Sequence, residues 1–169
     1  MSDGLDRLWA GWRHAYVSGE DSSPAPNGCV LCGVIAPGIA DEISNVIWRG
    51  GACVAVLNAY PYTSGHLMVM PARHVGELEA LEPPESAELW DGVRRAVVAV
   101  KAAYAPGGIN VGLNLGRSAG AGLPGHLHAH VVPRWDGDTN FMTSTAGVRV
   151  LPEALPDTWA KVRAAWPVA

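Results

Sequence analysis

The sequence has no excess of positive charge. Its 169 residues include 12 lysines and arginines against 16 aspartates and glutamates, which gives a formal net charge of -4 at pH 7. Proteins that bind nucleic acid regardless of sequence neutralise its phosphates with a surplus of basic side chains. We therefore expect no nucleic acid partner, and any phosphate-bearing ligand must be held by a local site.

Long apolar runs are missing as well. No stretch approaches the roughly 20 apolar residues that a membrane-spanning helix requires. The first residues, Met1-Ser2-Asp3-Gly4, have neither the basic start nor the apolar centre of a secretory signal. These absences predict no membrane partner and a cytoplasmic location. With 49% hydrophobic residues, one compact domain accounts for the length of the chain.

Cysteine is scarce. The chain has three cysteines, and an odd number does not form a complete set of disulfides. Cys29 and Cys32 are separated by two residues, a spacing that in a reducing compartment indicates metal ligation or redox chemistry. Cys53 lies in an apolar run and is expected to be a core residue.

Short apolar runs and one long periodic segment predict the secondary structure. The runs 52–57 and 66–70 have the length of strands and are separated by a turn-forming segment, so we expect an antiparallel pair. Apolar residues recur every three or four positions over 86–104, which predicts one long helix. The remaining predicted elements are a strand at 109–115, a strand at 126–132 ended by Pro133, and a short terminal helix at 156–166. Strand pairs with few helices favour an α+β fold on an antiparallel sheet.

Half of the six histidines lie in the segment His126-Leu127-His128-Ala129-His130. Alternate side chains of a strand share a face, so we expect the three imidazoles on one side and the apolar residues between them on the other. Neutral imidazole is a nucleophile and proton carrier near pH 7, and it is also a common zinc ligand. The segment therefore predicts either phosphoryl or nucleotidyl transfer or a metal-binding trio.

A glycine-rich loop, residues 114–122, directly precedes the histidine segment. Glycine allows a backbone to approach a ligand closely. The loop can bring backbone N–H groups, the Arg117 guanidinium and the Ser118 hydroxyl to a phosphate. Its position favours phosphate chemistry at the histidines.

The segment 126–132 matches the pattern H-x-H-x-H followed by two hydrophobic residues, and in this it resembles the histidine triad family. The upstream Gly65-His66-Leu67-Met68-Val69-Met70-Pro71 is similar to the other hallmark strand of that family. The resemblance covers residues 29–133, and the segment 135–141 that follows is similar to the family's bacterial diadenosine tetraphosphate phosphorylases. It implies a histidine-triad-like α+β fold: an antiparallel sheet with one long helix and a short C-terminal helix.

The resemblance also implies a two-step cleavage of a dinucleoside polyphosphate such as diadenosine tetraphosphate. His128 is expected to attack the α-phosphorus and form a nucleotidyl-histidine, which phosphate or water then resolves. His130 and His66 are expected to orient the phosphate and carry protons. The expected substrate-binding residues are Asn58, Asn114, Arg117, Ser118, Gly120 and Gly122. No organic cofactor is expected.

The resemblance of the Asn114 loop and of the segment after Pro133 to the phosphorylases favours phosphate over water as the acceptor. Gly122 counts against this, because it offers only a backbone N–H where relatives often carry a polar side chain. Arg117 and Ser118 can compensate, since a guanidinium and a hydroxyl suffice to hold an inorganic anion. The alternative is a hydrolase of dinucleoside polyphosphates or nucleoside phosphoramidates.

A second set of residues is implied by the zinc-bearing members of the family: Cys29, Cys32, His74 and His126. Four nitrogen and sulfur ligands are what a closed tetrahedral zinc site requires. The zinc is expected to be structural, which leaves His128 free for chemistry.

Two functions of other classes remain open at this point. One is a metallohydrolase in which the three triad histidines hold a catalytic zinc, although no carboxylate lies within the strand. The other is a non-catalytic nucleotide-binding module. The chain is expected to divide into an N-terminal arm and loop at residues 1–28, a histidine triad domain at 29–141, and a C-terminal extension with a short helix at 142–169.

A homodimer or higher oligomer is expected, because members of this family commonly pair their sheets. Tryptophans near both ends either pack on their own domain or are covered by a partner; they are Trp9, Trp12, Trp159 and Trp166. The expected partners are a nucleotide or dinucleotide substrate, inorganic phosphate and a second copy of the chain.

Overall fold

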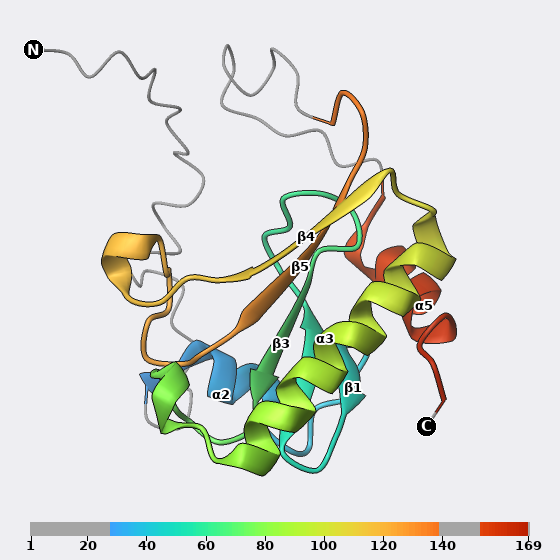
Figure 1. The fold of residues 1–169 in the computed structure, drawn as a ribbon. Helices are drawn as coiled ribbons and strands as arrows, with labels where there is room; N and C mark the ends of the chain where they lie inside the picture. The colour runs from blue at the N-terminus through green and yellow to red at the C-terminus, as the bar shows by residue number, and fades with distance from the viewer. Residues whose placement is uncertain (1–27, 139–152, 169) are drawn as a thin grey trace, which may run out of the picture.

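A five-stranded antiparallel sheet forms the centre of the computed structural model, which describes residues 28–138 and 153–168 (Figure 1). The strands are β1 (Val46–Arg49), β2 (Cys53–Leu57), β3 (Leu67–Pro71), β4 (Gly108–Leu113) and β5 (Ala129–Arg134). They lie in the order β1-β2-β3-β5-β4, and every neighbouring pair is antiparallel. The predicted α+β fold is confirmed, including the pairing of the two apolar runs as β2 and β3.

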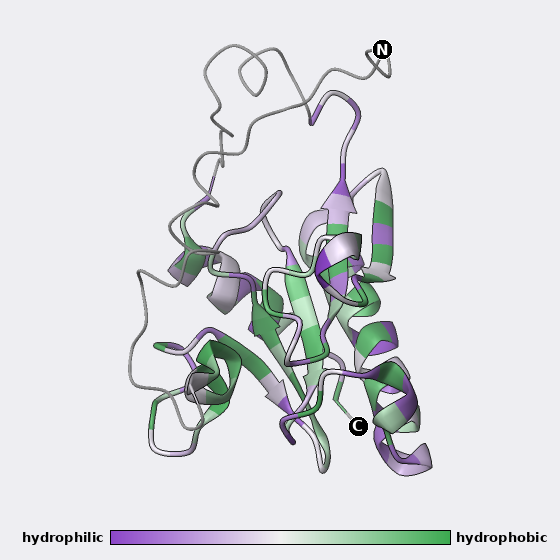
Figure 2. Cartoon of the chain, turned by 90° about the vertical axis from the view of Figure 1, so that its left-hand side faces the viewer, coloured by the Kyte–Doolittle hydropathy of each residue, from purple (hydrophilic) through white to green (hydrophobic). Residues whose placement is uncertain are grey.

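Helices cover both faces of this sheet. The long helix α3 (Pro83–Tyr104) crosses one face, and α5 (Leu155–Ala164) packs beside it (Figure 1). The short helix α2 (Val30–Ile35) packs on the other face. Two 3-10 turns, η3 (Leu78–Ala80) and η4 (Arg117–Ala119), lie in the connections. Figure 2 shows apolar colouring concentrated on the strands and alternating with polar colouring along the helices, as expected for helices that bury one face.

The long helix begins three residues before its predicted start. Pro83 and Pro84 occupy its first positions, where a proline loses no helical hydrogen bond, and Glu82 and Glu85 form a capping box there. On the buried face, a Cβ at Gly92 would lie 2.8 Å from Cγ1 of Val69. This glycine lets α3 pack closely on β3. The close packing positions the strands that carry the site.

The last strand differs from its prediction. It spans Ala129–Arg134, so His126 and His128 precede it, and Pro133 lies inside it. Pairing with β3 ends at Val131, and beyond that point the carbonyl of Pro133 accepts a hydrogen bond of 2.8 Å from the Thr63 hydroxyl. The backbone of Pro133 therefore points to the side where pairing with β3 has already ended, so the missing N–H of proline costs no sheet hydrogen bond. The prediction that this proline ends the strand was wrong.

The sequence patterns did not predict α2 or β1, which are short. The terminal helix was predicted, and its Trp159 packs on the domain's own core, as does the neighbouring Trp166. Trp9 and Trp12 of the predicted N-terminal arm lie outside the described residues. In the two described ranges, no helix combines the length and apolar character that would carry it across a membrane.

Candidate active site and metal cluster

Gly65 places His66 at the entrance to β3. Its φ of +81° lies in the left-handed region, and a Cβ there would lie 2.9 Å from Cε2 of Tyr104, so only glycine fits. The backbone N–H of Tyr62 donates to Nδ1 of His66 at 3.1 Å. Because Nδ1 accepts, the neutral ring of His66 carries its proton on Nε2.

The position of the proton on His66 determines which ring nitrogen of His130 carries a proton. Nε2 of His66 lies 3.0 Å from Nδ1 of His130. With the proton on His66, Nδ1 of His130 accepts, and neutral His130 carries its own proton on Nε2. The strand register produces the pair, since His130 of β5 lies opposite Met68 of β3, two residues from His66. The structure thus brings together the two histidines that were predicted to carry protons.

His128 has the opposite arrangement of its ring nitrogens. Nδ1 lies 2.7 Å from the carbonyl oxygen of His126, which can only accept, so Nδ1 carries the proton and Nε2 holds a lone pair. The side chain is 9% exposed, and this burial lowers the pKa of His128, partly opposed by the bond to the carbonyl. His128 is therefore neutral near pH 7, with Nε2 in the form that a nucleophile requires.

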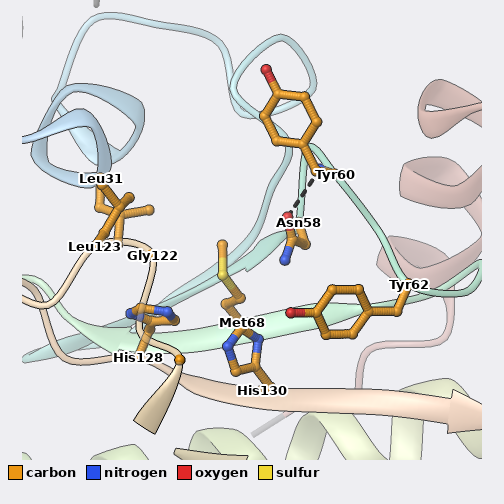
Figure 3. A pocket seen from close by; sticks show the side chains of 10 residues that line it. Leu31, Asn58, Tyr60, Tyr62, Met68, Gly122, Leu123, His128 and His130 are labelled. Carbon is orange, nitrogen blue, oxygen red and sulfur yellow. Dashed lines mark hydrogen bonds between the residues drawn. The ribbon is translucent and has the colours of Figure 1, made fainter. Parts of the chain in front are cut away.

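A pocket opens over these imidazoles (Figure 3). Its described lining consists of Leu31, Asn58, Tyr60, Tyr62, Met68, Gly120, Gly122, Leu123, His128 and His130. None of these residues is a lysine or arginine, so the donors that this lining can offer to a phosphate are imidazole N–H, the Asn58 amide, the tyrosine hydroxyls and backbone N–H groups. Asn58 accepts a hydrogen bond from the N–H of Tyr60 at 2.9 Å, and Figure 3 shows its side-chain nitrogen facing the pocket.

The predicted substrate-binding residues divide into two groups. Asn58, Gly120 and Gly122 line the pocket. The others, Asn114, Arg117 and Ser118, do not line it, and the last two are exposed on η4. Roles for these three in binding stay predictions.

The sequence analysis missed Tyr60 and Tyr62. They follow Asn58 at alternate positions after β2, and all three line the pocket. This period of two was a usable signal for the tyrosines. The contribution of Leu31 had no local signal, because α2 reaches the pocket only through tertiary packing.

The second predicted set of residues meets on the other side of the histidine segment. One ligand atom from each of Cys29, Cys32, His74 and His126 lies within 4.8 Å of the others. Nδ1 of His126 lies 3.6 Å from Sγ of Cys29 and 3.5 Å from Sγ of Cys32. Nδ1 of His74 lies 3.3 Å from Sγ of Cys32. Zinc bonds of about 2.3 Å to sulfur and 2.0 Å to nitrogen fit inside a group of this size.

The surroundings of His126 suit metal binding. Its Nε2 lies 2.9 Å from the carbonyl oxygen of Pro71, so Nε2–H donates there and the lone pair of Nδ1 faces the cysteines. Burial and the neighbouring Cys29 raise the pKa of the Cys32 thiol to about 11. A metal that binds this group must therefore displace a proton.

His126 is thereby separated from the other two triad histidines. It faces the cysteines, while the rings of His128 and His130 meet nearly at right angles in the pocket, with centroids 4.9 Å apart. The expectation that all three imidazoles share one face was wrong, because His126 and His128 precede the strand. Among the described residues, the geometry does not favour a metal held by the triad itself.

Comparison with known proteins identifies the family of the chain. The model of the HIT domain, the histidine triad domain, matches residues 41–137. The chain belongs to the HIT domain family. The AP-4-A phosphorylase of Mycobacterium tuberculosis is 45% identical to it over 167 residues, which are 97% of this chain and 86% of the relative.

Two further similar proteins are less alike in sequence. The asymmetrical bis(5'-nucleosyl)-tetraphosphatase of Schizosaccharomyces pombe is 33% identical over 95 residues, 56% of this chain and 52% of the relative. The crystal structure of a Zn-bound histidine triad family protein from Mycobacterium smegmatis is similar with a TM-score of 0.64 at 26% identity, covering 81% of this chain and 91% of the other.

Proposed function

We propose that this HIT protein is an enzyme that cleaves dinucleoside polyphosphates of the diadenosine tetraphosphate type, with His128 as the nucleophile. The observation that carries the proposal is the bond between Nδ1 of His128 and the carbonyl of His126, which leaves the lone pair of Nε2 for attack. The similarity to an AP-4-A phosphorylase over 97% of the chain supports this substrate class.

The first step forms a bond from Nε2 of His128 to the α-phosphorus. The bond from that phosphorus to the bridging oxygen breaks, and ATP leaves with the electron pair. Nε2–H of His130, held in this state by His66, donates to a phosphate oxygen as charge develops on it. His66 and His130 thus act as a fixed donor pair beside the nucleophile.

The second step transfers the nucleotidyl group from His128 to inorganic phosphate. A phosphate oxygen bonds to phosphorus, the phosphorus–nitrogen bond breaks, and its electron pair returns to His128, which gives ADP. With water as the acceptor the product is AMP. Asn58, Gly120 and Gly122 are proposed to bind substrate from the pocket wall, and Asn114, Arg117 and Ser118 from the adjacent loop.

Phosphate should determine the products. With diadenosine tetraphosphate and labelled phosphate, we expect ATP and ADP, with the label in the β-phosphate of ADP, because the incoming phosphate becomes that group. The measurement is chromatography of the products with and without phosphate. AMP and ATP formed at the same rate in both conditions, with no ADP, would show a hydrolase. Gly122, which offers no side-chain hydroxyl, and the similarity to a tetraphosphatase favour that alternative.

We also propose a structural zinc ion at Cys29, Cys32, His74 and His126. The donor set, the spacing of the ligand atoms and the bond from His126 to Pro71 support it, as does the similarity to a Zn-bound protein of this family. The ion would connect α2 to the segment that carries His128. Thiolate ligands suit a reducing compartment, so a cytoplasmic location belongs to the same proposal.

The domain division is proposed as residues 29–141 for the HIT domain, with an arm at 1–28 and an extension at 142–169. The match of the family model to 41–137 supports the central part. The helix α5 packs as part of the same folded unit, since its Val162 is buried in the hydrophobic core that α3 and the sheet share.

We propose that the protein forms a homodimer through the edge strand β4. The edge at β1 is covered by α5, because Trp159 donates to the carbonyl of Val46 at 2.8 Å and Arg163 to that of Ile47 at 3.1 Å. Within the described ranges, β4 pairs only with β5; it has no charged residue and is largely exposed. An uncharged edge of this kind readily pairs with another strand.

Sedimentation should therefore give twice the monomer mass at micromolar concentration. Val111→Lys places a charge on β4, where the side chain is 44% exposed, and is expected to give monomers that remain folded. Ile43→Lys, at a side chain that is 72% exposed away from this edge, is the control and should remain dimeric. A wild-type protein that sediments only as a monomer would contradict the proposal.

A further inference from the structure

The segment 57–62 separates two hollows of the molecule. Its even-numbered residues, Asn58, Tyr60 and Tyr62, line the candidate active site. Its odd-numbered residues, Leu57, Ala59 and Pro61, line a second cavity. Among the described lining residues, the two cavities have none in common.

The second cavity lies on the α5 side of the segment and has a volume of about 200 Å³. Leu155 and Thr158 of α5 form its far wall. Its near wall includes Ser64 and His66, so the cavity reaches the ring that holds His130 in place. Ala59 is exposed and also lines the cavity.

The polar groups that line this cavity indicate which kind of small molecule it can bind. Ser64 is 7% exposed, and its hydroxyl oxygen is buried without a hydrogen-bond partner. A buried hydroxyl in this state favours any molecule that supplies a partner, and rotation about χ1 lets it turn toward one. The carboxylate of Glu153 is already occupied by Lys161, Tyr104 and Thr158. A charged ligand would thus lose its hydration without finding an opposite charge.

We propose that this cavity binds a small, uncharged, mainly apolar molecule that carries one hydrogen-bonding group, with the Ser64 hydroxyl as its partner. A dry cavity of about 150 Å³ is large enough to bind benzene, so phenol fits the volume available here. The site is distinct from the one for nucleotide, and it touches that site only through His66 and the shared segment.

Phenol is the probe, titrated into the full-length zinc-loaded protein and followed by nuclear magnetic resonance. We expect saturable shifts in the amide signals of Ser64 and Gly65 and in the ring signals of His66, and we expect them unchanged when ADP fills the active site. Ser64→Ala should weaken phenol binding about two- to ten-fold and leave benzene binding unchanged, because only phenol uses the hydroxyl. Ala59→Leu, which places a larger side chain in the lining of the cavity, should weaken both.

Two results would overturn the proposal. In one, ADP displaces phenol, which places the probe in the nucleotide pocket. In the other, phenol binds Ser64→Ala and wild type equally, or gives no saturable shifts in wild type. Because Ser64→Ala removes an unpartnered hydroxyl, it is expected to fold at least as well as wild type, and a thermal melt checks this.

Discussion

His128→Ala is expected to abolish turnover of diadenosine tetraphosphate, with a loss of more than about 10³-fold in kcat, as for other enzymes that lose their nucleophile. The variant removes the only atom placed to form the bond to phosphorus in the proposed mechanism. The proposed nucleotide pocket keeps its other lining residues in this variant, so the affinity for ADP should change little. Initial rates and calorimetric titration with ADP measure the two quantities separately.

Detection of the covalent intermediate tests the same mechanism independently of the reaction rate. Wild-type protein mixed with substrate and quenched in acid should carry one nucleotidyl group on His128, detected by mass spectrometry of its peptides. His130→Ala keeps the nucleophile but loses the donor, so it should react slowly and still carry the group on His128. A His128→Ala variant with near-normal rates, and no modified histidine in wild type, would exclude this mechanism. A wild-type protein that binds ADP but turns over no substrate would support the non-catalytic alternative.

Removal of the cysteine pair should release zinc and destabilise the fold. Wild-type protein purified without chelator is expected to contain about one zinc ion per chain, and Cys29→Ser/Cys32→Ser none. A ligand present at roughly 100 to 1,000 times its Kd stabilises a protein by about 3 to 4 kcal/mol. For a chain of this size, such a loss lowers Tm by about 6 to 16 °C. Elemental analysis and thermal melts measure both effects.

Cys53→Ala is the matched control for the cysteine variants. Cys53 is fully buried but lies outside the cluster, so its substitution should lower stability and leave the zinc content unchanged. Acidification should release the metal, because the raised pKa of Cys32 means that protons compete for its sulfur. Wild-type protein without zinc, or a double variant that retains it, would refute the metal site.

Much of the fold could be predicted from the sequence because the relevant signals are local. Apolar residues recur every three or four positions in α3 and form short continuous runs in β2 and β3. These two patterns indicate which side chains are buried and thereby distinguish a helix from a strand. The histidine segment by itself left nucleotidyl transfer and metal binding open, and the glycine-rich loop with the family resemblance pointed to nucleotidyl chemistry and, at the second cluster, to the zinc ligands. No local period marks β1 or α2, whose four and six residues are too short to show one.

Only the tertiary structure decided which ring nitrogen of each histidine carries a proton and which keeps a lone pair. His66 and His130 are 64 residues apart and meet because the register of β3 and β5 puts them side by side. His126 turns to the cysteines and donates to Pro71, while His128 donates to a backbone carbonyl, so the ring nitrogens of the two residues face different partners. Which nitrogen keeps a lone pair depends on the acceptor that the fold places beside the other one. Residue order does not contain that information, because strand register and chain packing bring the acceptors there.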